Sequence, residues 1–295
     1  MTTAESVKLK PKKKENFWQT TFRRLFRNKM AVVGLIVVLL QVLMAIFAPV
    51  ITVHDPIRQN LGSSELPMFS AGHWLGTDNY GRDVWSRIVY GARISLVVGA
   101  VAVSLGLFGG VILGMLAGYY RKLDAVIMRF VDLLFSFPGI LLAMLIIAIL
   151  GTSLVNVAIA ISIWSIPTCA RIVRGSVLSI KEKEYIMAMR SMGASDLRIM
   201  VKHILPNVTA PIIVFATMRM ATAILSTASL SYLGLGAQPP TPEWGAMISQ
   251  GQDFMWTSPH LTIVPGIAIM LTVFAFNVLG DGLRDALDPN MDVEQ

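Results

Sequence analysis

The stretch EYIMAMRSMGASDLRIMVKHILP, Glu184–Pro206, decides the architecture because it is a charged segment set between long apolar runs. Its residues predict two short helices joined by a sharp break. Gly193 suits the left-handed conformation that ends a helix, and Ser195 suits the N-cap of the next helix. Asp196 then lies in the first turn, where the helix dipole favours an acidic side chain. We therefore predict a helix-turn-helix elbow held between two membrane spans.

The composition of the chain indicates its class. Hydrophobic residues make up 54% of the 295 positions, charged residues only 15%, and the mean hydropathy is +0.63. One water-soluble core cannot enclose so much apolar surface, so we predict an all-α membrane protein with several spans. The net charge of +7 does not indicate nucleic-acid binding, because the basic residues flank the apolar runs. The single cysteine, Cys169, excludes a disulfide framework within the chain.

Apolar runs separated by basic segments predict six membrane-spanning helices and both termini in the cytoplasm. The predicted spans cover residues 30–53, 94–120, 125–150, 154–173, 207–230 and 261–279. Outside them lie a basic cytoplasmic tail (1–29), which contains an interfacial amphipathic helix at 16–28, an extracytoplasmic segment (54–93) and a cytoplasmic C-terminus (284–295). Residues 94–283 form a five-helix core that includes the inner loop 174–206 and an outer loop 231–259.

Several residues inside the spans have a predicted role in packing or transport. A groove for close helix packing is predicted by glycines at every fourth position of the second span: Gly106, Gly110, Gly114 and Gly118. Pro138 and Pro167 interrupt the third and fourth spans and leave carbonyl groups free. These prolines either line a water-filled path or serve simple helix packing. Arg129 and Asp132 are three residues apart and predict a local ion pair.

Arg219 lies near the middle of the fifth span, where an arginine costs about 2.5–3.5 kcal/mol on insertion scales. It should therefore face protein or water and have a partner. Two interpretations are open. Arg219 either attracts carboxylate or phosphate-like groups of a passing solute, or it pairs with an acidic side chain of its own bundle or of a second subunit. The ion pair is the preferred interpretation.

The extracytoplasmic segment ends in LGTDNYGRDVWSRIVYGARISL at 75–96, where turn residues precede a helix pattern. The preferred interpretation of its charges is structural pairing of two arginines with two aspartates: Arg82 and Arg87 with Asp78 and Asp83. A metal site is the weaker alternative, with the ligands His73, Asp78 and Asp83.

No catalytic motif competes with a transport function. The sequence has no Gly-rich phosphate loop ending in Gly-Lys-Ser/Thr, so ATP must be bound by another chain. The four histidines are scattered, and neither His-Glu-x-x-His nor Gly-x-Ser-x-Gly occurs. We therefore predict that the chain is not an enzyme and needs no cofactor. A secondary transporter or a channel is the alternative, since both can work without an ATPase.

The elbow resembles a cytoplasmic loop of the permease subunits of binding-protein-dependent ABC importers. That family carries Glu-Ala-Ala, three spacers, Gly, nine spacers and Ile-x-Leu-Pro. Here the frame falls on Met187-Ala188-Met189, Gly193 and His203-Ile204-Leu205-Pro206. The central Ala, the Gly, the Leu and the Pro match, whereas the leading Glu, the last Ala and the Ile do not. The resemblance implies that ATPase subunits engage this coupling loop through the following residues: Glu184, Tyr185, Ala188, Met189, Gly193, Ala194, Ser195, Asp196, Leu205 and Pro206.

The apolar face of the elbow is the part that we expect to enter a groove of the ATPase, because flexible methionines on an amphipathic helix suit such a site. Packing of the same stripe against the membrane is the alternative. The stripe consists of Tyr185, Ile186, Met189 and Met192.

Two further motifs extend the resemblance over nearly the whole chain. Gly-Thr-Asp-x-x-Gly-Arg-Asp-x-x-Ser-Arg at 76–87 resembles the signature of peptide and nickel importer permeases, in the C-type subunit. Gly-Ala-Gln-Pro-Pro-Thr-Pro-Glu-Trp-Gly at 236–245 is closely similar to the same family, as is the tail at 277–289. The resemblance implies that the outer loop faces the solute-binding protein, that residues 246–255 form a short helix, and that the contact involves Pro239, Pro240, Glu243 and Trp244.

The resemblance implies a type I ABC importer permease in a bacterial cytoplasmic membrane. Its expected partners are a second permease subunit in a heterodimer, two ABC ATPase subunits, an extracytoplasmic solute-binding protein and the lipid bilayer. The expected substrates are dipeptides, oligopeptides or glutathione, and a nickel or metal-chelate importer is the alternative. The candidate translocation pathway comprises Arg219, Pro138 and Pro167.

Overall fold

The computed structural model describes residues 17–287, and these residues form helices and no β-strand. The predicted all-α fold is therefore confirmed. Residues 1–16 of the predicted basic tail and residues 288–295 of the predicted C-terminal segment lie outside the described residues, whereas the predicted amphipathic helix is present from Phe17. In chain order the α-helices are α1 (Phe17–Arg27), α2 (Lys29–Ile46), α3 (Ala48–Ile51), α4 (Val84–Tyr119), α5 (Arg121–Phe135), α6 (Gly139–Leu150), α7 (Leu154–Lys181), α8 (Glu184–Ser191), α9 (Asp196–Ile199), α10 (Leu205–Tyr232), α11 (Trp244–Gly251) and α12 (His260–Leu287). Single turns at Leu61–Ser63 (η1), Met200–Ile204 (η2) and Gln252–Phe254 (η3) complete the set.

Within residues 17–287, five helical segments are long and apolar enough to cross a membrane. They are α2, α4, α7, the continuous run Asp196–Tyr232, and α12. A sixth crossing exists only if α5 and α6 are counted together, and these two helices meet at an angle of 89°. Pro138 lies at this break, where its ring disfavours helix in the preceding residue. The interruption predicted at Pro138 within the third span, 125–150, is therefore confirmed, and it divides this region into two sharply bent helices.

Two other predicted span boundaries differ from the structure. The first predicted span, 30–53, is interrupted after Ile46, and Pro49 opens the separate short helix α3. The second, predicted to begin at residue 94, begins at Val84, because the Asp83 carboxylate caps the helix by accepting a hydrogen bond from the Ser86 amide. With 36 residues, α4 is about 54 Å long and extends beyond a hydrocarbon core of about 30 Å.

The centre of the bundle is the pair α4 and α7, which pack along most of their lengths. Close approach depends on the predicted glycine groove. A Cβ atom at Gly106 would lie 2.7 Å from the Ser165 Cβ, and one at Gly114 would lie 2.6 Å from the Ala170 carbonyl oxygen. Real Cβ atoms do not approach other atoms so closely, so only glycine permits this helix spacing. The groove that was predicted from a glycine at every fourth position is confirmed.

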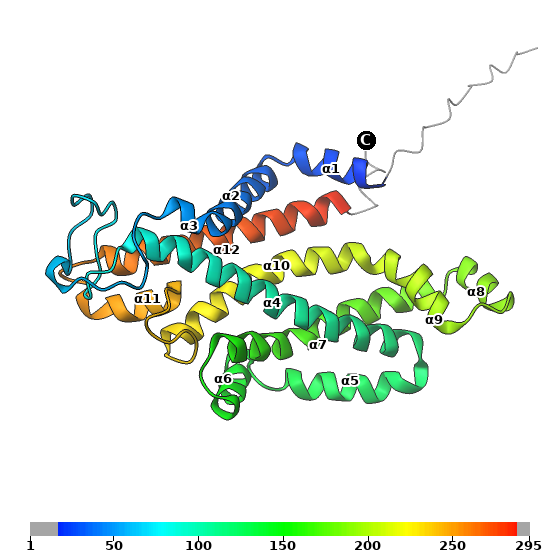
Figure 1. Cartoon of the computed structure of the whole chain (residues 1–295). Coiled ribbons are helices and arrows are strands. Elements are labelled where there is room, and N and C mark those ends of the chain that lie inside the picture. Colours follow the sequence, from blue (N-terminus) through cyan, green and yellow to red (C-terminus); the bar gives the residue numbers. More distant parts are fainter. Residues whose placement is uncertain (1–16, 288–295) are drawn as a thin grey trace, which may run out of the picture.

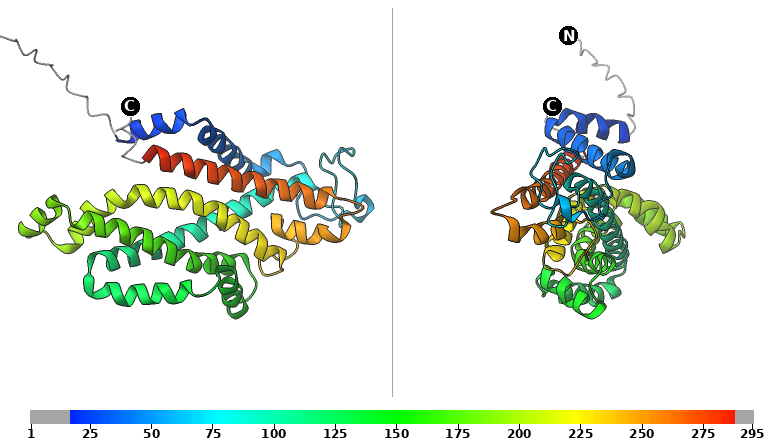
Figure 2. Two further views of the ribbon diagram at one scale, coloured as in Figure 1. Left: turned by 180° about the vertical axis from the view of Figure 1, so that it is seen from behind. Right: turned by 60° about the vertical axis from the view of Figure 1, so that its left-hand side comes forward.

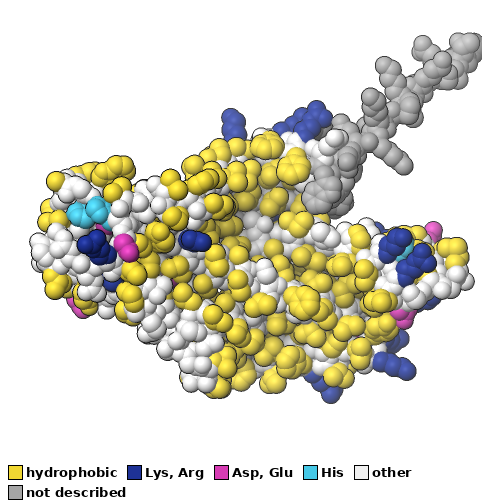
Figure 3. Space-filling model, viewed as in Figure 1, with side chains coloured by type: hydrophobic (Ala, Val, Ile, Leu, Met, Phe, Trp, Pro, Cys, Tyr) yellow, Lys and Arg dark blue, Asp and Glu magenta, His cyan; other side chains and the backbone are white. Residues whose placement is uncertain are grey.

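The other helices are arranged on both sides of this pair. Figures 1 and 2 show α2 and α12 along one edge of the bundle, α5 and α6 at the opposite edge, and α10 between α12 and α7. Contact between α2 and α12 includes a buried hydrogen bond from the Gln41 side-chain amide to the Thr272 hydroxyl (2.8 Å). Figure 3 shows a broad apolar surface between two ends, of which one carries α8 and α9 and the other carries α11 and the segment 52–83. The functional candidates lie at these two ends and on α10 between them.

Candidate functional site at the elbow and the pathway

The turn between α8 and α9 has the backbone geometry predicted from the sequence. Gly193 has φ +81°, in the left-handed region. The Ala194 amide donates to the Met189 carbonyl (3.1 Å), and the Gly193 amide donates to the Arg190 carbonyl (3.0 Å). These two bonds form a Schellman motif, which satisfies carbonyls that the end of a helix leaves free. The elbow is therefore set by local backbone bonds.

At the start of α9 the prediction holds for Asp196 and fails for Ser195. Asp196 lies in the first turn, whereas Ser195 occupies the N-cap position but its side chain accepts no capping hydrogen bond. Asp196 also accepts a hydrogen bond from the Tyr119 hydroxyl at the end of α4 (2.6 Å). Arg190 of α8 donates to the same hydroxyl (3.1 Å), which raises the pKa of the Arg190 guanidinium. Tyr119 thus joins both helices of the elbow to α4, and sequence analysis did not identify it.

The elbow buries two isoleucines and exposes other apolar side chains. Ile186 and Ile199 are fully buried in a core with Val177 and Ile180 of α7. The prediction that Ile186 faces a partner is therefore wrong, because this side chain attaches the elbow to its own bundle. Met189 is half-buried. We define the elbow surface as its exposed large apolar side chains: Tyr185, Met187, Met192 and Leu197.

The other predicted coupling residues surround this surface. Glu184 begins α8, Ala188 is exposed on it, and Ala194 is half-buried against the core beneath. Leu205 and Pro206 begin α10, which continues from α9 through η2 without a break in helical conformation. The structure thus brings the predicted coupling residues into one protruding unit, which Figure 1 shows beyond the ends of α4 and α7.

Arg219 has neighbours that the sequence did not predict. Its Nε donates to the Ser165 hydroxyl (2.8 Å), and its guanidinium lies 4.6 Å from the centre of the Trp164 ring. Its Nη2 atom is buried without a hydrogen-bond partner. No ion pair joins Arg219 to an acidic side chain within residues 17–287, so a partner in its own bundle is not found there. A buried polar atom without a partner is costly.

The predicted pathway prolines lie close to Trp164. Pro167 is buried inside α7, three residues beyond Trp164. Pro138 is exposed at the start of α6, and the next residue, Gly139, lies so close to the Trp164 ring that a Cβ atom there would overlap it. The break before α6 therefore lets that helix approach the tryptophan that covers Arg219. Trp164 thus lies between Arg219 and the start of α6.

The outer loop differs from its prediction in which residues are accessible. Pro239 and Pro240 are exposed, whereas Glu243 and Trp244 are fully buried. The Trp244 indole donates to the Ile88 carbonyl (3.1 Å), so the loop is attached to α4. Direct contact of Glu243 and Trp244 with a binding protein does not fit side chains enclosed in this way, and for them the prediction fails.

Glu243 caps the short helix α11, which begins two residues before the predicted helix at 246–255. One carboxylate oxygen accepts a hydrogen bond from the Ala246 amide (2.9 Å), and the other has no partner. Burial raises the pKa of this carboxyl. The loop that follows α10 is therefore held by an enclosed acidic group and an enclosed indole.

The pairing predicted for the extracytoplasmic segment is confirmed for Asp78 and wrong for Asp83. Arg82 (2.6 Å) and Arg87 (3.5 Å) both approach one oxygen of Asp78, and all three side chains are largely buried. Asp83 bonds instead with Ser86 and His73.

A second predicted ion pair is also wrong. Asp132 accepts a hydrogen bond from Arg171 of α7 (2.6 Å) rather than pairing with Arg129. Its partner, Arg171, is on another helix and lies 39 positions away in the sequence.

Comparison with known proteins identifies the family. The model for "Binding-protein-dependent transport system inner membrane component" matches residues 110–293, and the model for "N-terminal TM domain of oligopeptide transport permease C" matches residues 16–67. The chain belongs to the binding-protein-dependent transport system inner membrane components. The first of these two regions contains the elbow, Arg219 and the outer loop.

Two relatives extend the match over almost the whole chain. The dipeptide transport system permease protein DppC of Alkalihalophilus pseudofirmus is 51% identical over 93% of this chain and 90% of the relative. The glutathione transport system permease protein GsiD of Pectobacterium atrosepticum is 48% identical over 93% of this chain and 91% of the relative. The family expected from the sequence motifs is confirmed.

Solved structures support the fold. The MetNI methionine ABC transporter in an inward-facing conformation matches with a TM-score of 0.57 and 22% identity, covering 68% of this chain and 96% of that chain. An amino acid ABC transporter crystallised with histidines matches with a TM-score of 0.53 and 16% identity, covering 68% of this chain and 94% of that chain. The fold is therefore that of a type I ABC importer permease.

Proposed function

We propose that this chain forms half of the translocation pathway of an ATP-driven importer of short peptides, in the dipeptide, oligopeptide or glutathione class. In this proposal its partners are a second permease subunit, two ATPase subunits and an extracytoplasmic solute-binding protein. Both termini and the elbow lie on the cytoplasmic side of a bacterial inner membrane. The names of the dipeptide and glutathione relatives support a peptide substrate over the nickel or metal-chelate alternative.

The observation that carries the proposal is the elbow surface. Met192 and Leu197 are 76% and 68% exposed, at the tip of a unit that is firmly attached beneath. Large apolar side chains grouped on a protruding helix pair mark a protein-binding site, and methionines adapt to a groove. A secondary transporter or a channel gives no reason for such a surface at this position.

The attachments of the elbow supply a route for coupling. Tyr119 joins it to α4, Ile186 and Ile199 pack it against α7, and α9 continues into α10, which carries Arg219. Packed helices shift as units, so movement of the elbow by an ATPase would move α4 and α10 relative to the remaining bundle. Alternation between outward and inward access follows from such tilting.

The experiment that tests this function is ATP-driven uptake of labelled di- and tripeptides into vesicles containing the chain with its partner subunits. Met192→Glu places a charge in the elbow surface and should abolish both uptake and co-purification of the ATPases. Met68→Glu is the matched control, because it places the same charge on an exposed methionine at the opposite end, outside the loop that is expected to face the binding protein. Uptake that continues without nucleotide, or equal uptake by both variants, would contradict the proposal.

Arg219 is proposed to contact the peptide on its way through the bundle. The unpartnered Nη2 suits a carboxylate, which every free peptide carries, and the Trp164 ring holds the guanidinium in position. Arg219→Ala should lower uptake by about tenfold or more, the equivalent of 1.4 kcal/mol or more, while the assembled complex stays in the membrane. Loss of the complex would instead assign Arg219 to a structural pair with the second subunit.

A further inference from the structure

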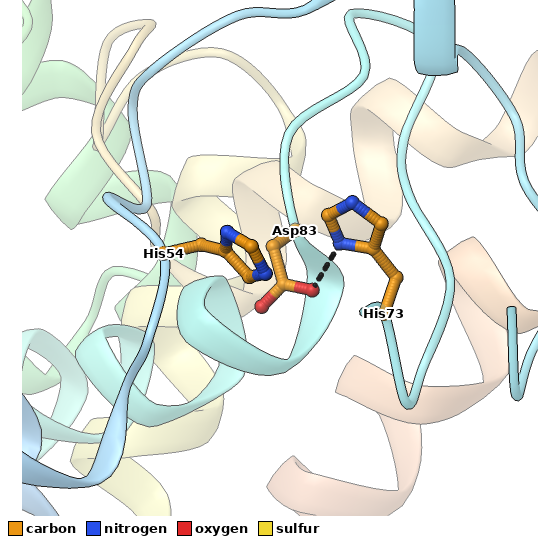
Figure 4. Close-up of side chains that lie close together, drawn as sticks. All are labelled: His54, His73 and Asp83. Atoms are coloured by element: carbon orange, nitrogen blue, oxygen red, sulfur yellow. Dashed lines mark hydrogen bonds and ion pairs between the residues drawn. The ribbon is translucent and has the colours of Figure 1, made fainter. Parts of the chain in front are cut away.

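Three metal-ligating side chains from separate segments meet at the outer end of the molecule. His54 follows α3, His73 lies in a loop bridged to Ser70, and Asp83 is the N-cap of α4. Each of His54, His73 and Asp83 offers a ligand atom within 4.8 Å of the others. Figure 4 shows the Asp83 carboxylate between the two imidazole rings. The sequence suggested a weaker set with Asp78, but Arg82 and Arg87 occupy that carboxylate.

Each member of this trio is held in place by one or two hydrogen bonds. The His73 Nδ1 and the Asp83 Oδ1 are 2.9 Å apart, and the His54 Nε2 lies 2.9 Å from the Gly72 carbonyl oxygen. The other Asp83 oxygen accepts from the amide and the hydroxyl of Ser86, which orients the carboxylate. The rings are stacked with their centres 4.6 Å apart, so one ring must turn before both can coordinate a single ion. His54 and Asp83 are oriented by groups outside the trio, as metal ligands usually are.

The trio is reachable from the extracytoplasmic side. His54, His73 and Asp83 line a cavity of about 430 Å³, which Asp55 also lines. Both histidines are partly exposed, and Figure 3 shows histidine side chains at the surface of this end. Arg58 also lines this cavity, and its positive charge repels a cation that is attracted only by the acidic side chains. The arrangement therefore favours an ion held by direct coordination.

We propose that His54, His73 and Asp83 bind one divalent transition-metal ion of the zinc or nickel class. Two imidazoles and one carboxylate suit these ions, and the open side of the cavity leaves a position for water. Bonds of about 2.0–2.2 Å place neighbouring ligand atoms of a tetrahedral site about 3.3–3.5 Å apart. The His73 and Asp83 atoms need to separate by only a few tenths of an ångström, and the ion replaces the hydrogen that they share.

The proposed ion stabilises the fold and is not a transported solute. It would join the segment after α3, the loop at 70–73 and the first turn of α4, which are connected at this point by single hydrogen bonds. The site lies at the outer end of α4, away from Arg219 in the middle of α10, and its occupancy does not depend on which solute is transported.

The test is metal binding by the full chain, purified in detergent without a polyhistidine tag. After equilibration with Zn²⁺ and removal of free ion, mass spectrometry should find one zinc per chain. Co²⁺ as a probe should give the intense visible absorption of a tetrahedral site. His54→Ala and His73→Ala should each weaken Zn²⁺ binding by about 100-fold or more. His203→Ala, which removes a histidine near the elbow, should bind as the original chain does.

The outcomes separate a metal site from a hydrogen-bonded cluster. Absence of stoichiometric zinc in the original chain, or equal affinity in the His54→Ala and His203→Ala variants, would overturn the proposal. If a histidine variant does not fold, the Co²⁺ spectrum of the original chain decides, because an unchanged aquo-ion spectrum means that no site exists. Neither measurement requires transport, so its result is independent of the proposed function.

Discussion

The two ends of the molecule are held in shape by different kinds of contact. At the elbow end, two short helices are shaped by local backbone bonds, and their apolar tips have no cover within residues 17–287. At the outer end, buried charges and long-range contacts fix the chain to itself. Asp78 holds two buried arginines, and Trp244 bonds to a carbonyl 156 residues away.

This difference assigns different tasks to the two ends. The outer end also exposes large apolar side chains, such as Trp256 and Phe69, but its shape is fixed by its own buried charges and should depend mainly on them. The elbow end has a fixed attachment and an uncovered surface, so its role should depend on a partner and hardly affect folding. Variants at the two ends should therefore separate stability from coupling.

The largest effect should come from Asp78→Ala at the outer end. This change leaves Arg82 and Arg87 without their carboxylate, although both side chains are almost fully buried. Breaking a buried pair by removing one partner costs about 3–5 kcal/mol. We expect a sharp loss of folded protein from the membrane and a lower thermal midpoint in detergent.

Asp253→Ala is the control for this prediction. Asp253 is an exposed acidic residue in η3 at the same end. Its removal should change the midpoint little, since isolated surface charges contribute about 0–1 kcal/mol. Comparable yields of the two variants would mean that the buried network does not stabilise this end.

The next effect should come from Gly193→Val at the elbow, and it should appear in transport rather than in folding. A β-branched residue at φ +81° is strained by about 1–3 kcal/mol, although the space around Gly193 is empty. Peptide uptake should fall by about tenfold or more while membrane insertion continues. Gly175→Val is matched, because Gly175 also has empty space but lies in helical conformation. Unchanged uptake by the Gly193→Val variant would show that this turn has no role in coupling.

Features that depend on neighbouring residues were predictable from the sequence. The left-handed Gly193, the glycine groove on α4 and the apolar spans each depend on residue type at short spacing, which governs turns, close packing and hydropathy. Pro138 was identified as an interruption, but the size of the bend was not. A proline predicts that a helix stops, while the direction of the next helix depends on its packing, here of Gly139 against Trp164.

Contacts across the chain were not predictable. Asp132 pairs with a residue 39 positions away, and Tyr119 bonds to Asp196 at a separation of 77. The sequence spacing of these residues does not indicate which side chains will bond, because that depends on how α4, α5 and α7 pack. The family resemblance led us to expect Glu243 and Trp244 to contact a binding protein, but the indole fills space beside Gly91 that a side chain there would occupy.

A smaller effect should come from Tyr119→Phe, which removes the hydroxyl that joins both helices of the elbow to α4. Hydrogen bonds to charged groups contribute about 1.5–3 kcal/mol each at most, and partial exposure reduces this. We expect normal assembly but fewer peptides moved per ATP hydrolysed. Tyr232→Phe removes a tyrosine hydroxyl bond at the outer end (2.6 Å to Gln252) and should keep the original ratio. Equal ratios would mean that the elbow is coupled through its isoleucines alone.

The smallest effect should come from Glu243→Gln, measured as the pH dependence of stability. Burial raises the pKa of Glu243 above its ordinary value, so the folded chain favours the protonated, neutral carboxyl. The stability from this group is complete below the ordinary value and is lost as the pH rises through the raised value, because ionisation then leaves a buried charge. The thermal midpoint of the original chain should therefore fall across this window, and that of the Glu243→Gln variant should stay level, since an amide does not ionise and its oxygen can still cap α11. Glu184→Gln is the matched control, because Glu184 is an exposed glutamate at the elbow, and its thermal midpoint should vary with pH as in the original chain. A level profile in the original chain would mean that Glu243 is solvated, and the outer end would then be no more enclosed than the elbow.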